Sequence, residues 1–118
     1  NKLEKLAIRI GEISDEIREA KEQRSINLDK CAGSEDEDFQ PPLKGEFDVY
    51  FDNCLTNAYQ WVKSDREEFN TNTCFDEVIN MYGCANCIGA YNEKRKISKL
   101  KQERGRIVCN ISKIGKSL

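Results

Sequence analysis

The sequence predicts a mainly α protein, in which N- and C-terminal helices form an antiparallel hairpin closed by a small cysteine-ligated, partly helical knob. Three observations predict this fold. Apolar residues recur every three or four positions near both ends of the chain. The two prolines stand together at 41 and 42, outside both of these segments. Five of the six cysteines fall between the two segments. A chain of 118 residues has the length of a single domain, which we expect to span 1–118.

The N-terminal segment, residues 1–28, has the periodicity of a helix packed along one narrow face. Its apolar residues are spaced alternately by three and four positions, which is the pattern of a heptad seam. These seam residues are Leu3, Leu6, Ile10, Ile13, Ile17 and Ala20. The segment is therefore expected to be one helix.

The C-terminal segment repeats the pattern, with Arg104 at one seam position. Its apolar seam residues are Ile97, Leu100, Ile107, Ile111, Ile114 and Leu118. Each seam spans about 22 residues, or roughly 32 Å as an α-helix, so the two seams can bury each other. An antiparallel pair is favoured because a parallel pair needs a return path of the same length. The alternative is a homodimer, in which each seam meets a second copy.

The segment 29–83 between these helices reads as a compact knob. Residues 34–38 (SEDED) indicate an acidic turn, and the alternation of Phe47, Val49 and Phe51 predicts a short strand. Asn53 is the expected N-cap of a helix over 54–68. A second helix is expected over 74–82, with Thr73 as its N-cap and Gly83 as its C-cap. The first of these helices presents an apolar face to the core, namely Leu55, Ala58, Tyr59 and Val62, continued by Arg66 and Phe69.

The cysteines predict a metal site. Cys84 and Cys87 form a CxxC pair in the run GCANC, and the antiparallel hairpin brings Cys31 to the same end of the molecule. Tetrahedral zinc needs a fourth ligand. Cys54 suits that role, because a helix over 75–82 would hold Cys74 roughly 13–15 Å from Cys84. The expected structural zinc site is therefore Cys31, Cys54, Cys84 and Cys87, with Cys109 a free surface thiol.

Other readings of the cysteines stay open. The even count permits a disulfide framework, although cysteine is sparse for such a scaffold. A redox-active CxxC is a second alternative, and unligated reduced thiols are a third. Ligand type alone does not distinguish a zinc ion from an iron–sulfur cluster.

Composition argues against an enzyme. The chain contains no histidine, which excludes Ser-His-Asp and Cys-His catalysis and histidine ligands to a metal. No glycine-rich phosphate loop occurs, and four cysteines would close the coordination shell of a zinc ion. No apolar run has the length of a membrane span, and no signal-peptide pattern occurs at Asn1. We therefore expect a cytoplasmic, non-enzymatic binding protein without a membrane partner.

Charge is distributed unevenly along the chain. Residues 80–118 carry nine basic and two acidic side chains, whereas residues 29–79 carry thirteen acidic and four basic ones. A basic helical face next to a cysteine knuckle is suited to contacts with nucleic-acid phosphates. The candidate binding residues are Lys94, Arg95, Lys96, Lys99, Lys101 and Arg106. Two alternatives remain: these bases pair across the seam with Glu12, Glu16 and Glu19, or the acidic knob imitates nucleic acid and docks on a basic nucleoprotein.

The charged helical chain, the isolated GCANC and the ending KLKQERGRIVCNISKIGKSL resemble small accessory proteins of tailed bacteriophages. The resemblance covers the general style of the last 35 residues. It implies a protein of the host cytoplasm that binds a host nucleoprotein complex and inhibits a host system, for example an anti-CRISPR.

Overall fold

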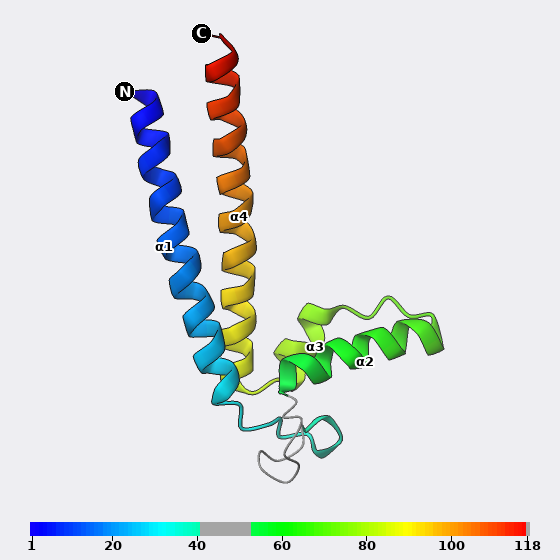
Figure 1. Ribbon diagram of the computed structural model, residues 1–118. Coiled ribbons are helices and arrows are strands. Elements are labelled where there is room, and N and C mark those ends of the chain that lie inside the picture. Colours follow the sequence, from blue (N-terminus) through cyan, green and yellow to red (C-terminus); the bar gives the residue numbers. More distant parts are fainter. Residues whose placement is uncertain (41–52, 118) are drawn as a thin grey trace, which may run out of the picture. The chain divides into compact units, whose positions relative to one another are not determined.

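A computed structural model describes residues 1–40 and 53–117, and most of these residues are helical (Figure 1). The elements are α1 (Lys2–Asp29), the 3₁₀ helix η1 (Glu37–Phe39), α2 (Cys54–Phe69), α3 (Phe75–Tyr82) and α4 (Ala85–Ser117). The predicted mainly α class is confirmed, and the described residues include no strand. The strand predicted around Phe47, Val49 and Phe51 lies outside the described residues, as does Leu118.

The chain divides into two compact units. Unit 1 comprises Asn1–Arg24 and Asn92–Leu118, and unit 2 comprises Ser25–Tyr91. The expectation of a single domain over 1–118 stays a prediction. Each unit has its own cluster of buried side chains, so each is described separately.

Unit 1 is the predicted helical hairpin. In Figure 1 α1 and α4 run antiparallel, with the N- and C-termini at the same end. The buried core lies along the two heptad seams and consists of Ile13, Ile17, Ala20, Ile97, Leu100 and Ile107. Leu6, Ile10 and Ile111 pack against it and are partly buried. The sequence periodicity thus identified both faces that meet in the hairpin.

An ion pair between Arg9 of α1 and Glu103 of α4 crosses the seam of unit 1, with the base on α1 and the acid on α4, which is the reverse of the predicted arrangement. Arg9 of α1 donates from Nε and Nη2 to the two carboxylate oxygens of Glu103 on α4, both at 2.9 Å. Glu12 and Glu16 also accept from Arg9, at 3.2 and 3.4 Å, so they pair within their own helix. The alternative in which Glu12, Glu16 and Glu19 pair with the bases of α4 stays a prediction, although two of these acids already contact Arg9 of their own helix.

Unit 2 has a second core, formed by short elements. Its buried residues are Phe39, Cys54, Ala58, Val62, Val78, Ile79 and Cys87. Phe39 of η1 contacts the rings of Trp61 and Tyr82, at centroid distances of 5.5 and 5.3 Å. Trp61 in turn stacks on Tyr82 at 5.8 Å. The acidic turn predicted at 34–38 is therefore an anchored segment, because the Phe39 that follows it inserts its ring into this core.

The buried face of α2 differs from the predicted one. Tyr59 and Phe69, assigned to the core face, are 64% and 70% exposed. The buried row is instead Cys54, Ala58 and Val62, spaced by four residues. Both rows contain Ala58 and Val62, and spacing alone does not decide between adjacent faces of one helix. The packing of Cys54 against the other cysteines decides it here.

The helix ends are partly as predicted. Asn53 caps α2, since its Oδ1 accepts from the Thr56 N–H at 2.9 Å. The N-cap of α3 is Cys74 rather than Thr73, whose hydroxyl instead donates to Asp65. The last helix begins at Ala85, so Cys87 lies in its first turn.

None of the helices within residues 1–40 and 53–117 combines the length and apolar character needed to cross a lipid bilayer.

Candidate metal centre

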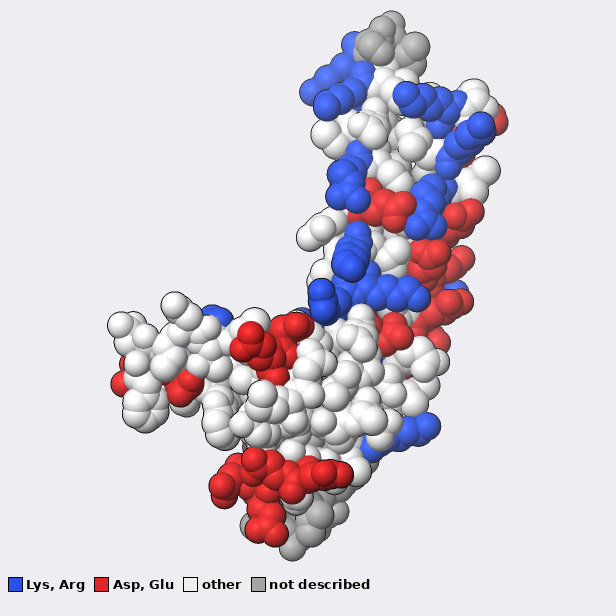
Figure 2. Space-filling view, turned by 180° about the vertical axis from the view of Figure 1, so that it is seen from behind, with Lys and Arg blue, Asp and Glu red and all other residues white. Residues whose placement is uncertain are grey.

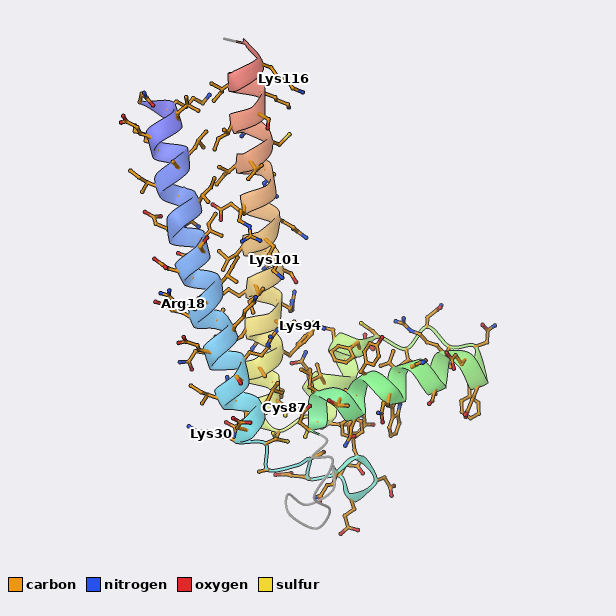
Figure 3. All side chains as sticks on the ribbon, in the orientation of Figure 1. Arg18, Lys30, Cys87, Lys94, Lys101 and Lys116 are labelled. Atoms are coloured by element: carbon orange, nitrogen blue, oxygen red, sulfur yellow. The ribbon has the colours of Figure 1, made fainter. Side chains whose placement is uncertain are left out.

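Four cysteines from three parts of unit 2 form one cluster. Cys31 follows the end of α1, Cys54 is the first residue of α2, and Cys84 and Cys87 stand at the start of α4. Their Sγ atoms all lie within 4.8 Å of one another. These are the four cysteines that the sequence predicts as ligands. Figure 3 labels Cys87 in the first turn of α4.

The backbone around Cys84 and Cys87 holds both thiols on one side. The Ile88 N–H donates to the Cys84 carbonyl at 2.9 Å, which closes the first turn of α4. The Cys87 N–H donates to Cys84 Sγ at 3.4 Å, so this sulfur takes the place of an N-cap oxygen. Residues three apart on a helix lie on the same face. The CxxC spacing therefore presents two sulfurs in one direction.

Local contacts also fix the two remaining cysteines. The Cys31 N–H donates to the Leu28 carbonyl at 3.2 Å, in a turn that follows α1. Asn86 Nδ2 donates to the Lys30 carbonyl at 2.9 Å, which ties the residue before Cys31 to the first turn of α4. The Asn53 cap orients the first turn of α2, where the side chain of Cys54 is fully buried.

The sulfur separations match a single tetrahedral ion. Cys31 Sγ lies 3.6 Å from Cys54 Sγ and 3.8 Å from Cys84 Sγ. Four sulfurs at about 2.3 Å from one zinc ion would be separated by about 3.8 Å. A disulfide bond is about 2.05 Å long, and all six cysteines of this structure are free thiols. The cluster can therefore hold one metal ion without rearrangement of the backbone.

Burial and hydrogen bonding affect the thiols differently. Desolvation raises the pKa of Cys54 to about 12, although the backbone N–H of Cys84 donates to its sulfur. Desolvation also raises the pKa of Cys87, and the neighbouring thiol of Cys31 adds to this effect. Burial alone would raise the pKa of Cys84, but N–H groups of Cys87 and Ala32 lower it to about 7. The backbone thus supplies N–H donors that support thiolate charge, as donors around bound metals do.

The other two cysteines are outside the cluster. Cys74 is partly buried at the N-cap of α3, and Cys109 is exposed on α4. This agrees with the predicted exclusion of Cys74 as a ligand and with the predicted surface position of Cys109. Both serve as internal references in experiments on the cluster.

The predicted binding residues of α4 divide into two sets in unit 1. Arg95, Lys96, Lys99 and Arg106 line one shallow groove with a volume of about 590 Å³. Lys94 and Lys101, labelled in Figure 3, are exposed but do not line it. All six side chains are exposed. Sequence analysis did not separate these two sets, because all bases of α4 outside the seam were treated alike.

Several functional contacts escaped sequence analysis. The Asn86–Lys30 contact supports the cluster, and Asn92 and Gln102 contribute polar groups to the groove. For the groove a signal existed: Asn92, Arg95, Lys99 and Arg106 recur at three, four and seven positions, which places them on one side of a helix. For Asn86 no sequence signal was available.

Comparisons of this chain with protein-family models, with curated proteins and with solved structures found no match.

Proposed function

We propose that the protein is a zinc-stabilised, non-enzymatic binding protein whose partner is nucleic acid. One observation carries the metal part of this proposal: four thiols meet in unit 2, with measured sulfur separations of 3.6 and 3.8 Å. Zinc is the ion that four cysteines most often bind as a closed tetrahedral site. Its role here is structural, because four protein ligands leave no position for a substrate.

A single ion is favoured over an iron–sulfur cluster by the size of the site. In a four-iron cluster each cysteine binds a different iron, so the ligand sulfurs stand further apart than around one ion. All four sulfurs here lie within 4.8 Å of one another. A zinc ion also supplies stability that a unit with few buried residues needs.

The binding part of the proposal rests on charge. Residues 92–106 of α4 carry seven bases and two acids, and one of these acids, Glu103, is already paired with Arg9. Lys96 and Lys99 make no ion pair with any residue in the described part of the chain. Lysine and arginine groups on one face attract phosphate through counterion release.

Metal analysis combined with thiol counting tests the zinc site. The purified full chain should contain about one zinc per molecule by plasma mass spectrometry, as expected for four cysteine ligands. A thiol reagent should label Cys74 and Cys109 at once, and the four cluster cysteines after a chelator is added. Absence of metal with all six thiols reactive at once, or disulfide bonds found by mass spectrometry, would refute the site.

The partner is tested by pull-down from a cell lysate, with and without nuclease. Capture of protein partners that nuclease abolishes supports binding through nucleic acid. Capture that resists nuclease supports the alternative expected from the bacteriophage resemblance, direct binding of a host nucleoprotein by an inhibitor such as an anti-CRISPR. That alternative, the homodimer and the cytoplasmic location stay predictions.

A further inference from the structure

The groove on α4 in unit 1 has a composition suited to a polyanion. Its lining includes four cationic side chains and two neutral polar ones, namely Arg95, Lys96, Lys99, Arg106, Asn92 and Gln102. No aromatic side chain lines it. Single-stranded nucleic acid is held chiefly by bases stacked on aromatic rings, and this groove offers no such surface.

The cationic residues follow the axis of a regular helix. Arg95, Lys99, Gln102 and Arg106 are separated by four, three and four residues, so they lie along one side of α4. At 1.5 Å per residue this row is about 16 Å long. Phosphates of one duplex strand advance by about 3.4 Å each along the duplex axis, so a row of this length can lie beside several of them. A rigid row of charge matches the fixed phosphates of a duplex better than a flexible single strand.

The one acid in the groove is held by the opposite helix. Glu103 lines the groove, and both of its carboxylate oxygens accept from Arg9 at 2.9 Å. The charge of Arg9 offsets the carboxylate that would otherwise repel a phosphate beside Lys99 and Arg106. Arg9 does not line the groove, so its effect on a ligand would act through Glu103.

The charged side chains of unit 1 are distributed unevenly between α1 and α4, and this affects where a polyanion can bind. In Figure 2 basic side chains lie along α4 and also over the upper part of α1, and acidic side chains form a band along the rest of α1. Glu12, Glu16 and Glu19 of α1 are spaced by four and three residues and share one side of that helix. This acidic band repels phosphate, which disfavours contact of a polyanion with that side of α1.

We infer that the α4 groove binds the phosphate backbone of a nucleic-acid duplex without base stacking, and that Arg9 is a positioning residue that neutralises Glu103 within it. The inference rests on the proposed function and makes it more specific. Duplex DNA and duplex RNA share the chemistry in question, which is a regular array of phosphates. Recognition is by charge and spacing rather than by sequence.

Fluorescence anisotropy on the full, zinc-loaded chain tests the inference, with a labelled DNA duplex, an RNA duplex of the same sequence and one of the DNA strands alone. We expect tighter binding to one or both duplexes than to the single strand. With about four phosphate contacts, affinity should fall roughly 100-fold between about 50 and 200 mM salt. Lys99→Gln and Arg106→Gln should each reduce the salt slope by about one, whereas Lys101→Gln, outside the groove, should change it little.

Two further variants separate the positioning role of Arg9 from a purely structural one. Glu103→Gln should tighten duplex binding several-fold, because it removes the negative charge from the groove. Arg9→Gln should weaken binding, because it leaves Glu103 unneutralised, and the double variant should bind nearly as well as Glu103→Gln. If the ion pair served only the fold, both single variants would break it and both would weaken binding.

The outcomes distinguish this inference from the proposed function. Equal or tighter binding to the single strand would overturn the duplex inference and leave the proposed function intact. Equal losses in Lys101→Gln and Lys99→Gln would overturn the groove assignment. No binding to any of the three probes would refute the proposed nucleic-acid partner as well.

Discussion

The two units of this protein bury their cores with different kinds of side chain. The six buried residues of unit 1 are all aliphatic and lie on two long helices that pack along heptad seams. Unit 2 buries two cysteines and one aromatic ring beside aliphatic residues, and its complete helices have 16 and 8 residues. Isolated helices shorter than about 12–15 residues are marginal in water. From this difference we expect apolar periodicity to be sufficient for unit 1 and unit 2 to depend on its sulfur cluster.

Metal removal is expected to have the largest effect and to fall mainly on unit 2. The chain has one tryptophan, Trp61, which is 41% exposed and whose ring stacks on Tyr82 of unit 2. Structural zinc contributes about 10–16 kcal/mol in zinc-finger peptides, so a chelator should expose Trp61 and shift its emission to longer wavelength. Far-UV circular dichroism should retain much of the helical signal from the hairpin.

The matched variants are Cys87→Ser, within the cluster, and Cys109→Ser, outside it. Cys87→Ser should reproduce the chelator effect in the untreated protein, whereas Cys109→Ser should behave as the parent chain does. An unchanged Trp61 emission after the metal has left would show that unit 2 does not depend on it.

The fold was predictable because its strongest signal is periodic. The seam residues Ile13, Ile17, Leu100 and Ile107 define one buried face on each terminal helix, and a hairpin is the economical way to bury both. The four clustered cysteines followed from that hairpin, since it brings Cys31 near the CxxC pair. The proximity of cysteines that are far apart in the sequence could therefore be deduced from the apolar periodicity of the two terminal helices.

The remaining details depended on packing that a local pattern does not encode. The face of α2 shifted because Cys54, not Tyr59, faces the core, and only the position of the other sulfurs determines this. Arg9 pairs with Glu103 because the two helices place them opposite each other in a register that the spacing left undefined. Contacts such as Asn86–Lys30 depend on backbone geometry between distant residues.

Replacing one buried isoleucine in each unit by alanine tests whether the two units unfold separately, and its expected effect is smaller than that of metal removal. Ile13 in unit 1 and Ile79 in unit 2 are both 0% exposed, and replacing either by alanine should cost about 2–5 kcal/mol. Urea unfolding followed by Trp61 fluorescence reports unit 2, and circular dichroism reports mostly the hairpin. Ile79→Ala should lower the first midpoint more than the second, and Ile13→Ala the reverse.

The exposed Ile8 provides the control for both truncations, since it is 63% exposed and Ile8→Ala should change stability by no more than about 0.5 kcal/mol. Coincident shifts of both signals in both variants would mean that the two units unfold together, and the distinction between them would not extend to stability.

One glycine in each unit offers a further comparison, in which replacement by alanine should change stability by about 1 kcal/mol and in opposite directions. A Cβ at Gly83 would lie 2.5 Å from the Ile79 carbonyl oxygen, although the φ of −71° suits any residue. Gly83→Ala should therefore cost about 1–3 kcal/mol, and it should weaken zinc retention because Cys84 follows directly. At Gly105, in the middle of α4, such a Cβ would meet no described atom within 4 Å apart from the neighbouring residues and backbone of its own helix, so Gly105→Ala should stabilise the hairpin by about 0.5–1 kcal/mol.

Thermal unfolding measures both glycine variants, with retained zinc determined in parallel under a competing chelator. A neutral Gly83→Ala would show that α3 can shift to admit the methyl group, and that its end is not tightly held beside the cluster.

The smallest expected effect is the pH dependence of the cross-seam pair. The hydrogen bonds from Arg9 lower the pKa of Glu103 below its usual range. A carboxyl whose pKa is lowered in the folded state stabilises that state above the pKa it has when unfolded, and the stabilisation is lost as pH falls through the folded value. The contribution of this pair should therefore be complete at neutral pH and decline in acid.

A carbon-13 NMR titration of the Glu103 carboxyl measures that pKa directly, and Arg9→Gln should return it towards the ordinary glutamate value. Glu103→Gln should show a smaller loss of hairpin stability in acid than the parent chain, since the group that would be protonated is absent. Acid also releases metal from cysteine ligands, so the comparison is made between variants at equal pH. Because this pair is accessible to solvent, salt should reduce its effect, whereas the aliphatic seam beneath it should not respond in that way. An Arg9→Gln chain with the same Glu103 pKa as the parent would show that Arg9 is not the cause of the lowered pKa, and that the ion pair contributes nothing to the pH dependence of the hairpin.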